Sequence, residues 1–330
     1  MRARELGVVI GNLRTGPHNA ITDVPRIRVG QETINDGASL HTGVTAIVPD
    51  ALLGRGRIPA GLFVGNGYGK LVGVSQLEEL GEIETPILLT GTLSAFRVAD
   101  ALVSWMIARP GNEEMTSVNP IVGETNDGTL SDIRLRPITE QHVFSALDGA
   151  ATGPVDEGCV GAGTGTSALG FKAGIGTASR VVAVDGVEAT VGVLVQANFG
   201  GTLLVQGTPI PAPPDIDEVQ RGNSCMIVVA TDAALDARQL RRIATRAVFA
   251  MGRVGASYSH GSGDYGIAIS VGEGDVVLDR ALDPVFAATQ DATEEALLNS
   301  LSMAVTTIGH MGRSREAVSL DAIRTAASKK

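Results

Sequence analysis

A chain of 330 residues with 44% hydrophobic and 19% charged residues has enough apolar side chain to bury a sizeable core. Its formal net charge is −10, and the sequence contains no cluster of Lys and Arg. Both features argue against nucleic acid as a partner. Its two cysteines, Cys159 and Cys225, form no CxxC pair, and no apolar run approaches the ~18 residues of a membrane span. We therefore expect a cytoplasmic protein with neither nucleic-acid nor membrane partners.

Short apolar runs bounded by turn residues predict strands along most of the chain. Only 3% of the residues are aromatic whereas 42 are glycine, so the strands must pack closely through Ala, Val, Ile and Leu. The predicted strands do not alternate strictly with helices, which favours sheets packed together with helices outside over one open parallel sheet. They are 43–49, 61–64, 87–90, 181–184, 190–197, 203–206, 225–230 and 265–271.

Three segments show helical periodicity. The first is 94–107, with apolar residues on one face. The second follows a capping box formed by Asp236 and Gln239 and runs to Gly252. The third is 291–308, whose inward residues we predict to be Leu297, Leu298, Leu301, Ala304 and Val305.

The junction between an exposed loop and a buried strand carries the first functional signal. The loop, TPIPAPPDIDEVQR (208–221), is proline-rich and acidic, and the strand is CMIVVAT (225–231). Between them, the hydroxyl of Ser224 can attack the carbonyl of Asn223 and form an ester that water hydrolyses into two chains. The new α-amine of Ser224, with a pKa of ~7.7–8.0, would suit a general base. A plain Gly222-Asn223-Ser224 turn is the alternative interpretation.

Other catalytic signatures are missing from the sequence. It contains no GxSxG, SxxK, HExxH or Walker A motif. A glycine pattern from Gly163 to Ala168 lacks the preceding strand that a dinucleotide site needs, so it is interpreted as a tight loop. A Ser-His-Asp triad would have to use His260, and a loop histidine is more often a solvated bystander.

Several segments, taken in order, resemble one family. They are ITDVPRIRVG (21–30), VGETNDGTLSDIR (122–134), VGVLVQANFG (191–200), SHGSGDYGIAIS (259–270) and GHMGR (309–313). Together with the Asn223-Ser224 junction they resemble the self-processing serine aminopeptidases that include the D-alanine esterase/amidase and the β-peptidyl aminopeptidases. The resemblance implies a single α/β domain over 1–330, a four-layer α/β/β/α sandwich cut into an α chain, 1–223, and a β chain, 224–330.

The resemblance also implies the catalytic roles. Ser224 would be the nucleophile, and Asn198, at the end of an apolar strand, would donate to the oxyanion. Ser262 and Asp264, in an S-G-acid motif, would support the nucleophile and handle protons together with the Ser224 α-amine. Some family members carry glutamate at the acidic position, so Asp264 is one methylene shorter. Without the resemblance, Asn198 and the Gly261–Asp264 stretch could each be an ordinary turn.

Substrate recognition is implied for the GETNDG stretch. Glu124 matches the family's carboxylate for the substrate amine, and a carboxylate at the closed end of a pocket suits a free ammonium. Asn126 falls near where the D-alanine-specific relative carries a tyrosine, which argues against assuming D-alanine specificity. The alternative for Glu124 is a solvated loop acid.

The expected function is therefore a self-processing N-terminal-serine aminopeptidase that releases small L-, D- or β-amino acids from small peptides, amides or esters. The resemblance implies a homo-oligomer of αβ units and neither metal nor cofactor. Two alternatives stay open. One is a threonine-type acetyltransferase-like relative, which Ser224 disfavours; the other is a catalytically inactive homologue that never cleaves.

Overall fold

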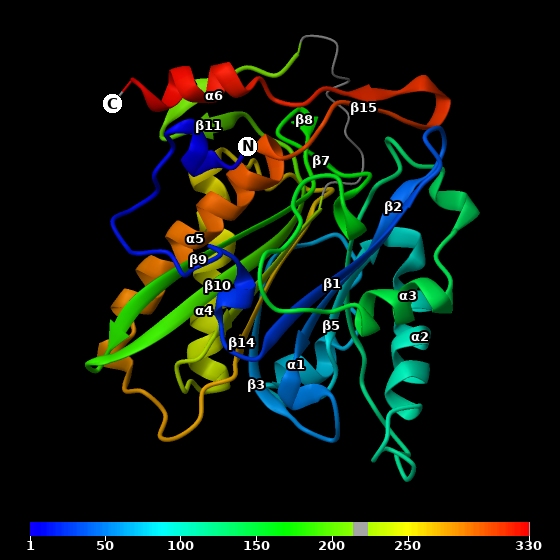
Figure 1. Ribbon diagram of the computed structural model, residues 1–330, viewed down its shortest axis with the longest axis vertical. Helices are drawn as coiled ribbons and strands as arrows, with labels where there is room; N and C mark the ends of the chain where they lie inside the picture. Colours follow the sequence, from blue (N-terminus) through cyan, green and yellow to red (C-terminus); the bar gives the residue numbers. More distant parts are fainter. Residues whose placement is uncertain (214–223, 330) are drawn as a thin grey trace.

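The computed structural model describes residues 1–213 and 224–329 and has a mixed α/β single-domain fold (Figure 1). Asn223, the residue on the N-terminal side of the predicted cleavage point, lies outside the described residues. Two sheets form the centre of the molecule. One has four strands in the order β1 (Ile27–Asn35), β2 (His41–Pro49), β5 (Ile87–Gly91) and β6 (Ile121–Thr125).

The second sheet has six strands. Their order is β4 (Glu82–Ile83), β3 (Ile58–Gly67), β14 (Gly263–Ser270), β13 (Ser224–Thr231), β10 (Val187–Asn198) and β9 (Ile175–Val184). The pair β13 and β14 is parallel, whereas both other neighbours of these two strands are antiparallel. As a result β13 and β14 begin where β10 ends, at one edge of the sheet.

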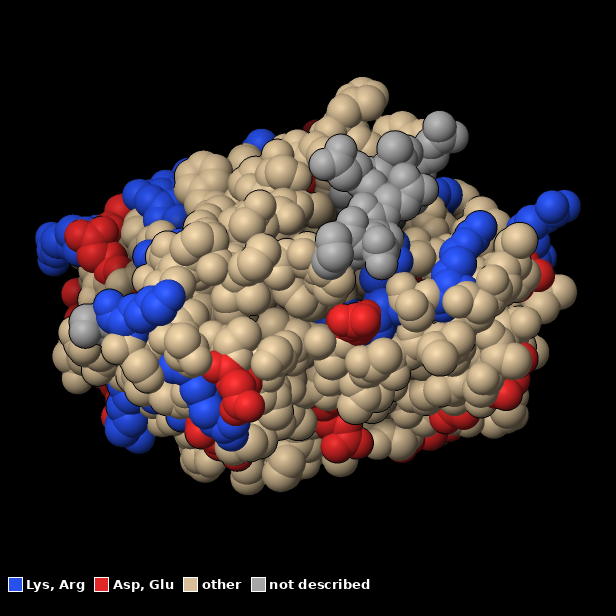
Figure 2. All heavy atoms as spheres, turned by 90° about the horizontal axis from the view of Figure 1, so that it is seen from above, with Lys and Arg blue, Asp and Glu red and all other residues tan. Residues whose placement is uncertain are grey.

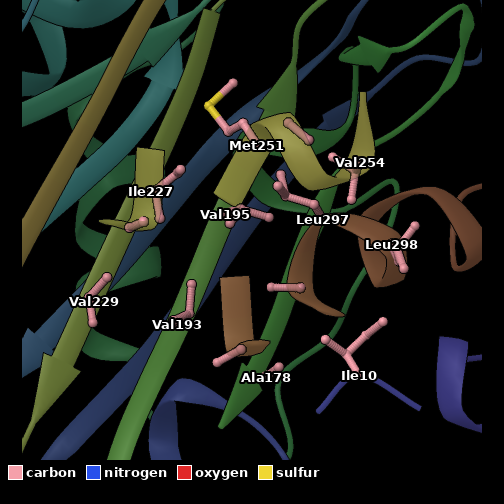
Figure 3. Close-up of a cluster of buried hydrophobic side chains, with 14 of the residues drawn as sticks. Ile10, Ala178, Val193, Val195, Ile227, Val229, Met251, Val254, Leu297 and Leu298 are labelled. Atoms are coloured by element: carbon pink, nitrogen blue, oxygen red, sulfur yellow. The ribbon is translucent and has the colours of Figure 1, made fainter. Parts of the chain in front are cut away.

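Alternation of side chains explains how the two sheets and the helices fit together. In β10, Leu194 joins a buried cluster with residues of the four-stranded sheet such as Ile47 and Leu89. Its neighbours Val193 and Val195 belong to a different cluster, on the opposite face (Figure 3). This is the period of two expected for a strand whose two faces are both buried.

Helices cover the outward faces of both sheets. Helices α4 (Ala237–Ala250) and α5 (Asp283–Ser302) pack on the six-stranded sheet, where Leu297 and Leu298 lie near Val193 and Val195 (Figure 3). Helices α2 (Ala95–Ile107) and α3 (Glu140–Asp148) pack on the four-stranded sheet. The remaining elements are short: α1 (Val74–Leu80), α6 (Leu320–Ala327), β7 (Ser167–Ala168), β8 (Phe171–Lys172), β11 (Leu203–Val205), β12 (Thr208–Ile210), β15 (Thr307–Ile308) and β16 (Ser314–Arg315).

A buried amide ties the two sheets together near the end of β10. Gln196 donates from Nε2 to the carbonyl oxygen of Thr90 at 3.1 Å and to that of Ala162 at 2.9 Å. Thr90 belongs to β5 of the other sheet. Because a buried amide without partners would be strongly destabilising, these bonds fix the separation of the sheets where β10 approaches its end.

Most predicted elements are present, but the third helix was placed wrongly. Helix α5 begins at Asp283, with Pro284 in its first turn, and ends at Ser302. The β-branched run 305–308 leaves the helix, and Val305, predicted to face inward, is 62% exposed. Residues 203–205 form a separate hairpin with 208–210, so the predicted exposed loop begins as a strand.

Charged side chains of both signs are mixed on the surface. On the face shown in Figure 2, Lys and Arg side chains are interspersed with Asp and Glu instead of gathering into one basic patch. Within 1–213 and 224–329, no helix combines the length and apolarity needed to cross a membrane.

Candidate active site

Ser224 lies where three strands of the larger sheet meet at their ends. It is the first residue of β13 and is only 3% exposed. On one side it pairs with Asn198, the last residue of β10, and on the other with Gly263, the first residue of β14. Because β13 is buried along its whole length, the predicted nucleophile lies inside the protein, at the end of a central strand of the sheet.

Asn198 is held in one orientation beside Ser224. Its side-chain Oδ1 accepts a hydrogen bond from the backbone N–H of Ser167 at 3.0 Å, and the residue is buried. This bond orients the amide, whose Nδ2 group is the donor that could stabilise a developing oxyanion.

Ser262 and Asp264 flank Gly263, the partner of Ser224 on β14. The Ser262 Oγ donates to Asp264 Oδ1 at 2.7 Å, and both side chains are buried. Gly263 is required at this position, because a Cβ here would lie 2.9 Å from the carbonyl oxygen of Tyr68. The serine–acid pair predicted from the S-G-acid motif is thus formed, next to the strand that carries Ser224.

The buried carboxyl of Asp264 has a raised pKa. Burial raises its pKa from 3.8 to about 6, and the hydrogen bond from Ser262 opposes that rise. Its Oδ2 atom has no hydrogen-bond partner among the described residues. A carboxyl with a pKa near 6 can change its protonation state at physiological pH, as a general acid or base must.

A pocket of about 420 Å³ opens beside Ser224. Its walls are formed by the glycine-rich turn 67–70 and by Thr92, Glu124, Asn126 and Ser224. The structure therefore brings the predicted nucleophile and the two predicted substrate-binding residues into one concave site, although they are up to 100 positions apart in the sequence. A volume of this size accommodates a small ligand.

Glu124 is a buried strand residue, and the alternative of a solvated loop acid is wrong. It lies in β6 opposite Thr90 of β5, and it is 2% exposed. Its Oε1 accepts a hydrogen bond from the backbone N–H of Lys70 at 2.8 Å. Its Oε2 is buried without a hydrogen-bond partner within the described part of the chain. A buried carboxylate oxygen without a partner could accept a charge-assisted hydrogen bond from a cationic group of a ligand.

Three neighbours of Glu124 were not predicted from the sequence. The Nζ of Lys70 lies 3.8 Å from Glu124 Oε1 and donates to Thr92 Oγ1 at 2.8 Å. Tyr265 is also buried nearby, where desolvation and the charge of Glu124 raise the pKa of its hydroxyl. One signal was available in the sequence: Lys70 is one of four lysines against 22 arginines, and it stands in the glycine-rich stretch GNGYGK.

Two candidates are less closely engaged in the site. Asn126 lines the pocket, but its Oδ1 accepts the backbone N–H of Gly128 at 2.9 Å, which commits that atom to a local turn. His260 is exposed, with its ring centroid 6.0 Å from that of Tyr68, and it is not among the lining residues of the pocket. The geometry therefore gives no support to a triad based on His260.

No cluster of three or more potential metal ligands occurs within the ranges that the structure covers. Among the described residues that line the pocket, the charged ones are the acid Glu124 and the base Lys70. The described part of the site therefore contains a hydroxyl (Ser224), a carboxylate (Glu124) and an ammonium group (Lys70).

Comparison with known proteins identifies relatives over nearly the whole chain. Residues 19–315 match the model of peptidase family S58. The chain is 38% identical to the beta-peptidyl aminopeptidase BapA of Sphingosinicella microcystinivorans, over 94% of this chain and 88% of that enzyme.

Solved structures agree with this assignment. A protein of Pyrococcus horikoshii OT3 superposes with a TM-score of 0.91 at 39% identity, covering 99% of this chain and 98% of that one. The L-aminopeptidase D-Ala-esterase/amidase of Ochrobactrum anthropi gives a TM-score of 0.90 at 35% identity, with 99% and 98% covered. That enzyme is described as a prototype of the serine aminopeptidases and as a variant of the Ntn hydrolase fold.

Proposed function

Because the chain belongs to peptidase family S58, we propose that it is a self-processing serine aminopeptidase releasing small N-terminal residues, whether L-, D- or β-amino acids, from peptides, amides or esters. The observation that carries this proposal is the pocket shared by Ser224 and Glu124. The site holds a hydroxyl nucleophile and a buried carboxylate, one oxygen of which has no hydrogen-bond partner among the described residues. Together they suit an acyl substrate that carries a free ammonium.

The fold is proposed to be the family's four-layer α/β/β/α sandwich, cut into an α chain, 1–223, and a β chain, 224–330. Three separate apolar clusters support the layer count: one between the sheets and one under each pair of helices. The position of Ser224 as the first residue of a buried strand supports the cleavage point.

In self-cleavage, the Oγ of Ser224 attacks the carbonyl carbon of Asn223 and the C–N bond between the two residues breaks. The acyl group then forms an ester on Oγ, and Ser224 gains a free α-amine. Water hydrolyses the ester, which leaves a carboxylate on Asn223 and regenerates the hydroxyl.

In turnover, the same Oγ attacks the carbonyl of the substrate. Nδ2 of Asn198 stabilises the oxyanion, a contact worth ~2.7–4 kcal/mol in the transition state. The α-amine of Ser224, with Ser262 and Asp264, moves the proton from the nucleophile to the leaving amine. Glu124 binds the ammonium of the substrate, and Asn126 contributes to the wall beside it.

Electrophoresis tests the processing step. The purified protein should run as two bands near roughly 23 and 11 kDa, in proportion to the lengths of the two chains, and the smaller should begin Ser-Cys-Met-Ile. Ser224→Ala should give one uncut band without activity, whereas His260→Ala should keep most of both properties. Loss of turnover in a folded His260→Ala protein would favour the conventional triad.

Substrate pairs test the aminopeptidase assignment. Alanyl- and β-alanyl-p-nitroanilide should be hydrolysed, and their N-acetylated forms should be poor substrates, because acetylation removes the charge that Glu124 binds. Equal turnover of free and blocked substrates would show a different peptidase specificity. An intact, inactive wild-type chain would instead identify a catalytically inactive homologue. The threonine-type acetyltransferase alternative gains no support, since the position is a serine.

We further propose that the αβ units form a homo-oligomer in the cytoplasm. Large apolar side chains that remain exposed on the single chain, among them Phe96, Leu135 and Met311, support an assembly that covers them. Cys159 and Cys225 are free thiols, which suits a reducing compartment. Light scattering of the purified protein measures the mass of the assembly.

A further inference from the structure

Lys70 places a second charge at the amine-binding end of the pocket. Its Nζ lies 3.8 Å from Glu124 Oε1 and donates to Thr92 Oγ1 at 2.8 Å. Its side chain remains 40% exposed, and both Lys70 and Thr92 line the pocket that contains Ser224. The ammonium group of Lys70 is therefore within reach of a ligand that occupies the pocket.

The stability of the fold does not account for this side chain. Glu124 Oε1 is already bound by the backbone N–H of Lys70, which any residue except proline would provide. The separation of Nζ from the carboxylate is too long for a hydrogen bond, and a partly exposed ion pair contributes only ~0–1 kcal/mol. The position of the charge at the pocket wall points instead to recognition.

A ligand that matches both groups carries an ammonium and a carboxylate on the same carbon. Its ammonium would meet Oε2 of Glu124, the oxygen that has no partner in the described chain, and its carboxylate would meet Nζ of Lys70. Such an arrangement alternates the four charges, so each group has an opposite charge beside it.

We propose that this site accepts β-aspartyl peptides and amides, a substrate class that rests on the aminopeptidase function proposed above. In an ordinary α-linked residue, the carboxyl on the amine-bearing carbon is itself the scissile carbonyl and carries no charge. In a β-aspartyl residue that carboxyl stays free, and the scissile carbonyl lies one methylene further on. The spacing between amine and scissile carbonyl is then the same as in a β-alanyl residue.

The chemical step needs no additional reactant. Ser224 Oγ bonds to the β-carbonyl carbon, the C–N bond to the downstream residue breaks, and the leaving nitrogen takes the proton lost by the hydroxyl. Water then attacks the β-aspartyl ester, which releases aspartate and returns the proton to Ser224 Oγ.

Three substrates on the processed wild-type enzyme test the proposal. They are the p-nitroanilides of β-alanine, of aspartate linked through its β-carboxyl, and of the same aspartate with its α-carboxylate converted to a carboxamide. The β-aspartyl substrate should have a kcat/KM about 10- to 100-fold above that of its carboxamide analogue, because only the carboxylate makes a charge-assisted contact with Lys70.

Substitutions assign the preference to Lys70. Lys70→Met should lower the ratio of the β-aspartyl to the β-alanyl kcat/KM by about 10- to 100-fold, and Lys70→Arg should restore most of it. Arg14→Met is a matched control, because it removes one charge next to the exposed Glu188, near the opposite end of β10 from Asn198. That variant should leave the ratio unchanged.

The outcomes separate this proposal from the function on which it rests. Hydrolysis of the β-alanyl substrate with no preference for the β-aspartyl over the carboxamide substrate would overturn the role of Lys70 and leave the aminopeptidase in place. An equal loss on both substrates in Lys70→Met would show that Lys70 only positions Glu124. Failure of all three free-amine substrates would contradict the proposed function itself.

Discussion

Asn198 and Ser224 lie directly opposite each other on the last rung of the β10–β13 ladder. Asn198 ends β10 and Ser224 begins β13. The pairing of the two strands therefore places the side-chain amide of Asn198 beside the hydroxyl of Ser224. The amide is oriented in turn by the N–H of Ser167. This geometry allows the donor role of Asn198 to be tested apart from its structural role.

We predict that Asn198→Asp lowers kcat by about 100- to 1,000-fold with a small effect on KM. The carboxylate still accepts the N–H of Ser167, but it replaces the donor by a negative charge where the oxyanion forms. Asn198→Ala is the companion variant, because it also leaves the buried Ser167 N–H unpaired and should lower the free energy of unfolding by ~1–3 kcal/mol. Steady-state kinetics and urea unfolding distinguish the two effects. Unchanged kcat in Asn198→Asp would remove Asn198 from the mechanism.

The pH dependence of activity should report Asp264. Its carboxyl accepts a hydrogen bond from Ser262 and has a pKa raised to about 6 by burial. If the ionised form is the active one, kcat/KM should fall about tenfold per pH unit below pH 6 and level off above it. Asp127 is a useful comparison, because burial raises its pKa to about 6 as well and it does not line the pocket. Asp127→Asn should retain the acid limb, whereas a limb that disappears in that variant would assign it to Asp127.

Asp264 should also make stability depend on pH. Its folded pKa is raised above the unfolded value, so the folded state holds the proton more tightly and loses stability as pH rises from about 4 to 6. Two pKa units correspond to roughly 3 kcal/mol, fully lost above pH 6. Relative to wild type, Asp264→Asn should therefore gain stability between pH 4 and pH 6 in urea unfolding. A difference between the two proteins that does not change with pH would contradict the raised pKa.

Local patterns in the sequence predicted much of this arrangement. The capping box of α4 is formed as expected, with Gln239 N–H donating to Asp236 Oδ1 at 2.7 Å. The apolar run ending in Asn198 is a buried strand with a polar end. The end of α5 was missed because the helical periodicity continues into the β-branched residues 305–308. Of these, 307 and 308 instead pair as a strand with 314 and 315, a contact that helical periodicity does not report.

Long-range contacts account for what the sequence alone did not predict. Glu124 is buried because β6 pairs with β5, and its side chain accepts a hydrogen bond from the backbone of Lys70, 54 residues earlier. No local sequence pattern predicts the contact between Lys70 and Glu124. The same holds for the pocket itself, since its walls come from four separate segments.

A buried ion pair away from the pocket should be important for stability. Arg180 and Glu295 are fully buried and 2.6 Å apart, and Glu295 also accepts hydrogen bonds from Arg4 and Asn19 of the N-terminal segment. Glu295→Gln should lower the free energy of unfolding by ~3–5 kcal/mol, because it leaves the charge of Arg180 without compensation. Glu188→Gln breaks an exposed pair with Arg14 and should have an effect below ~1 kcal/mol. Urea unfolding of both variants measures the contrast, and equal effects would contradict it.

Glu124→Gln isolates the recognition of the substrate amine. The amide oxygen can still accept the N–H of Lys70, so the strand and the pocket wall should be preserved. The variant lacks the negative charge beside the substrate ammonium, a charge-assisted contact worth roughly 1.5–3 kcal/mol. We therefore expect kcat/KM for alanyl- and β-alanyl-p-nitroanilide to fall by about 10- to 150-fold.

The same variant should still process itself, because self-cleavage at Ser224 uses no substrate amine. Two bands on electrophoresis together with reduced turnover would separate recognition from the chemistry of the nucleophile. The ratio of free to N-acetylated substrate turnover should also fall, since the acetylated substrate has no charge for Glu124 to bind. Retention of the wild-type ratio in processed Glu124→Gln would place amine recognition elsewhere in the pocket.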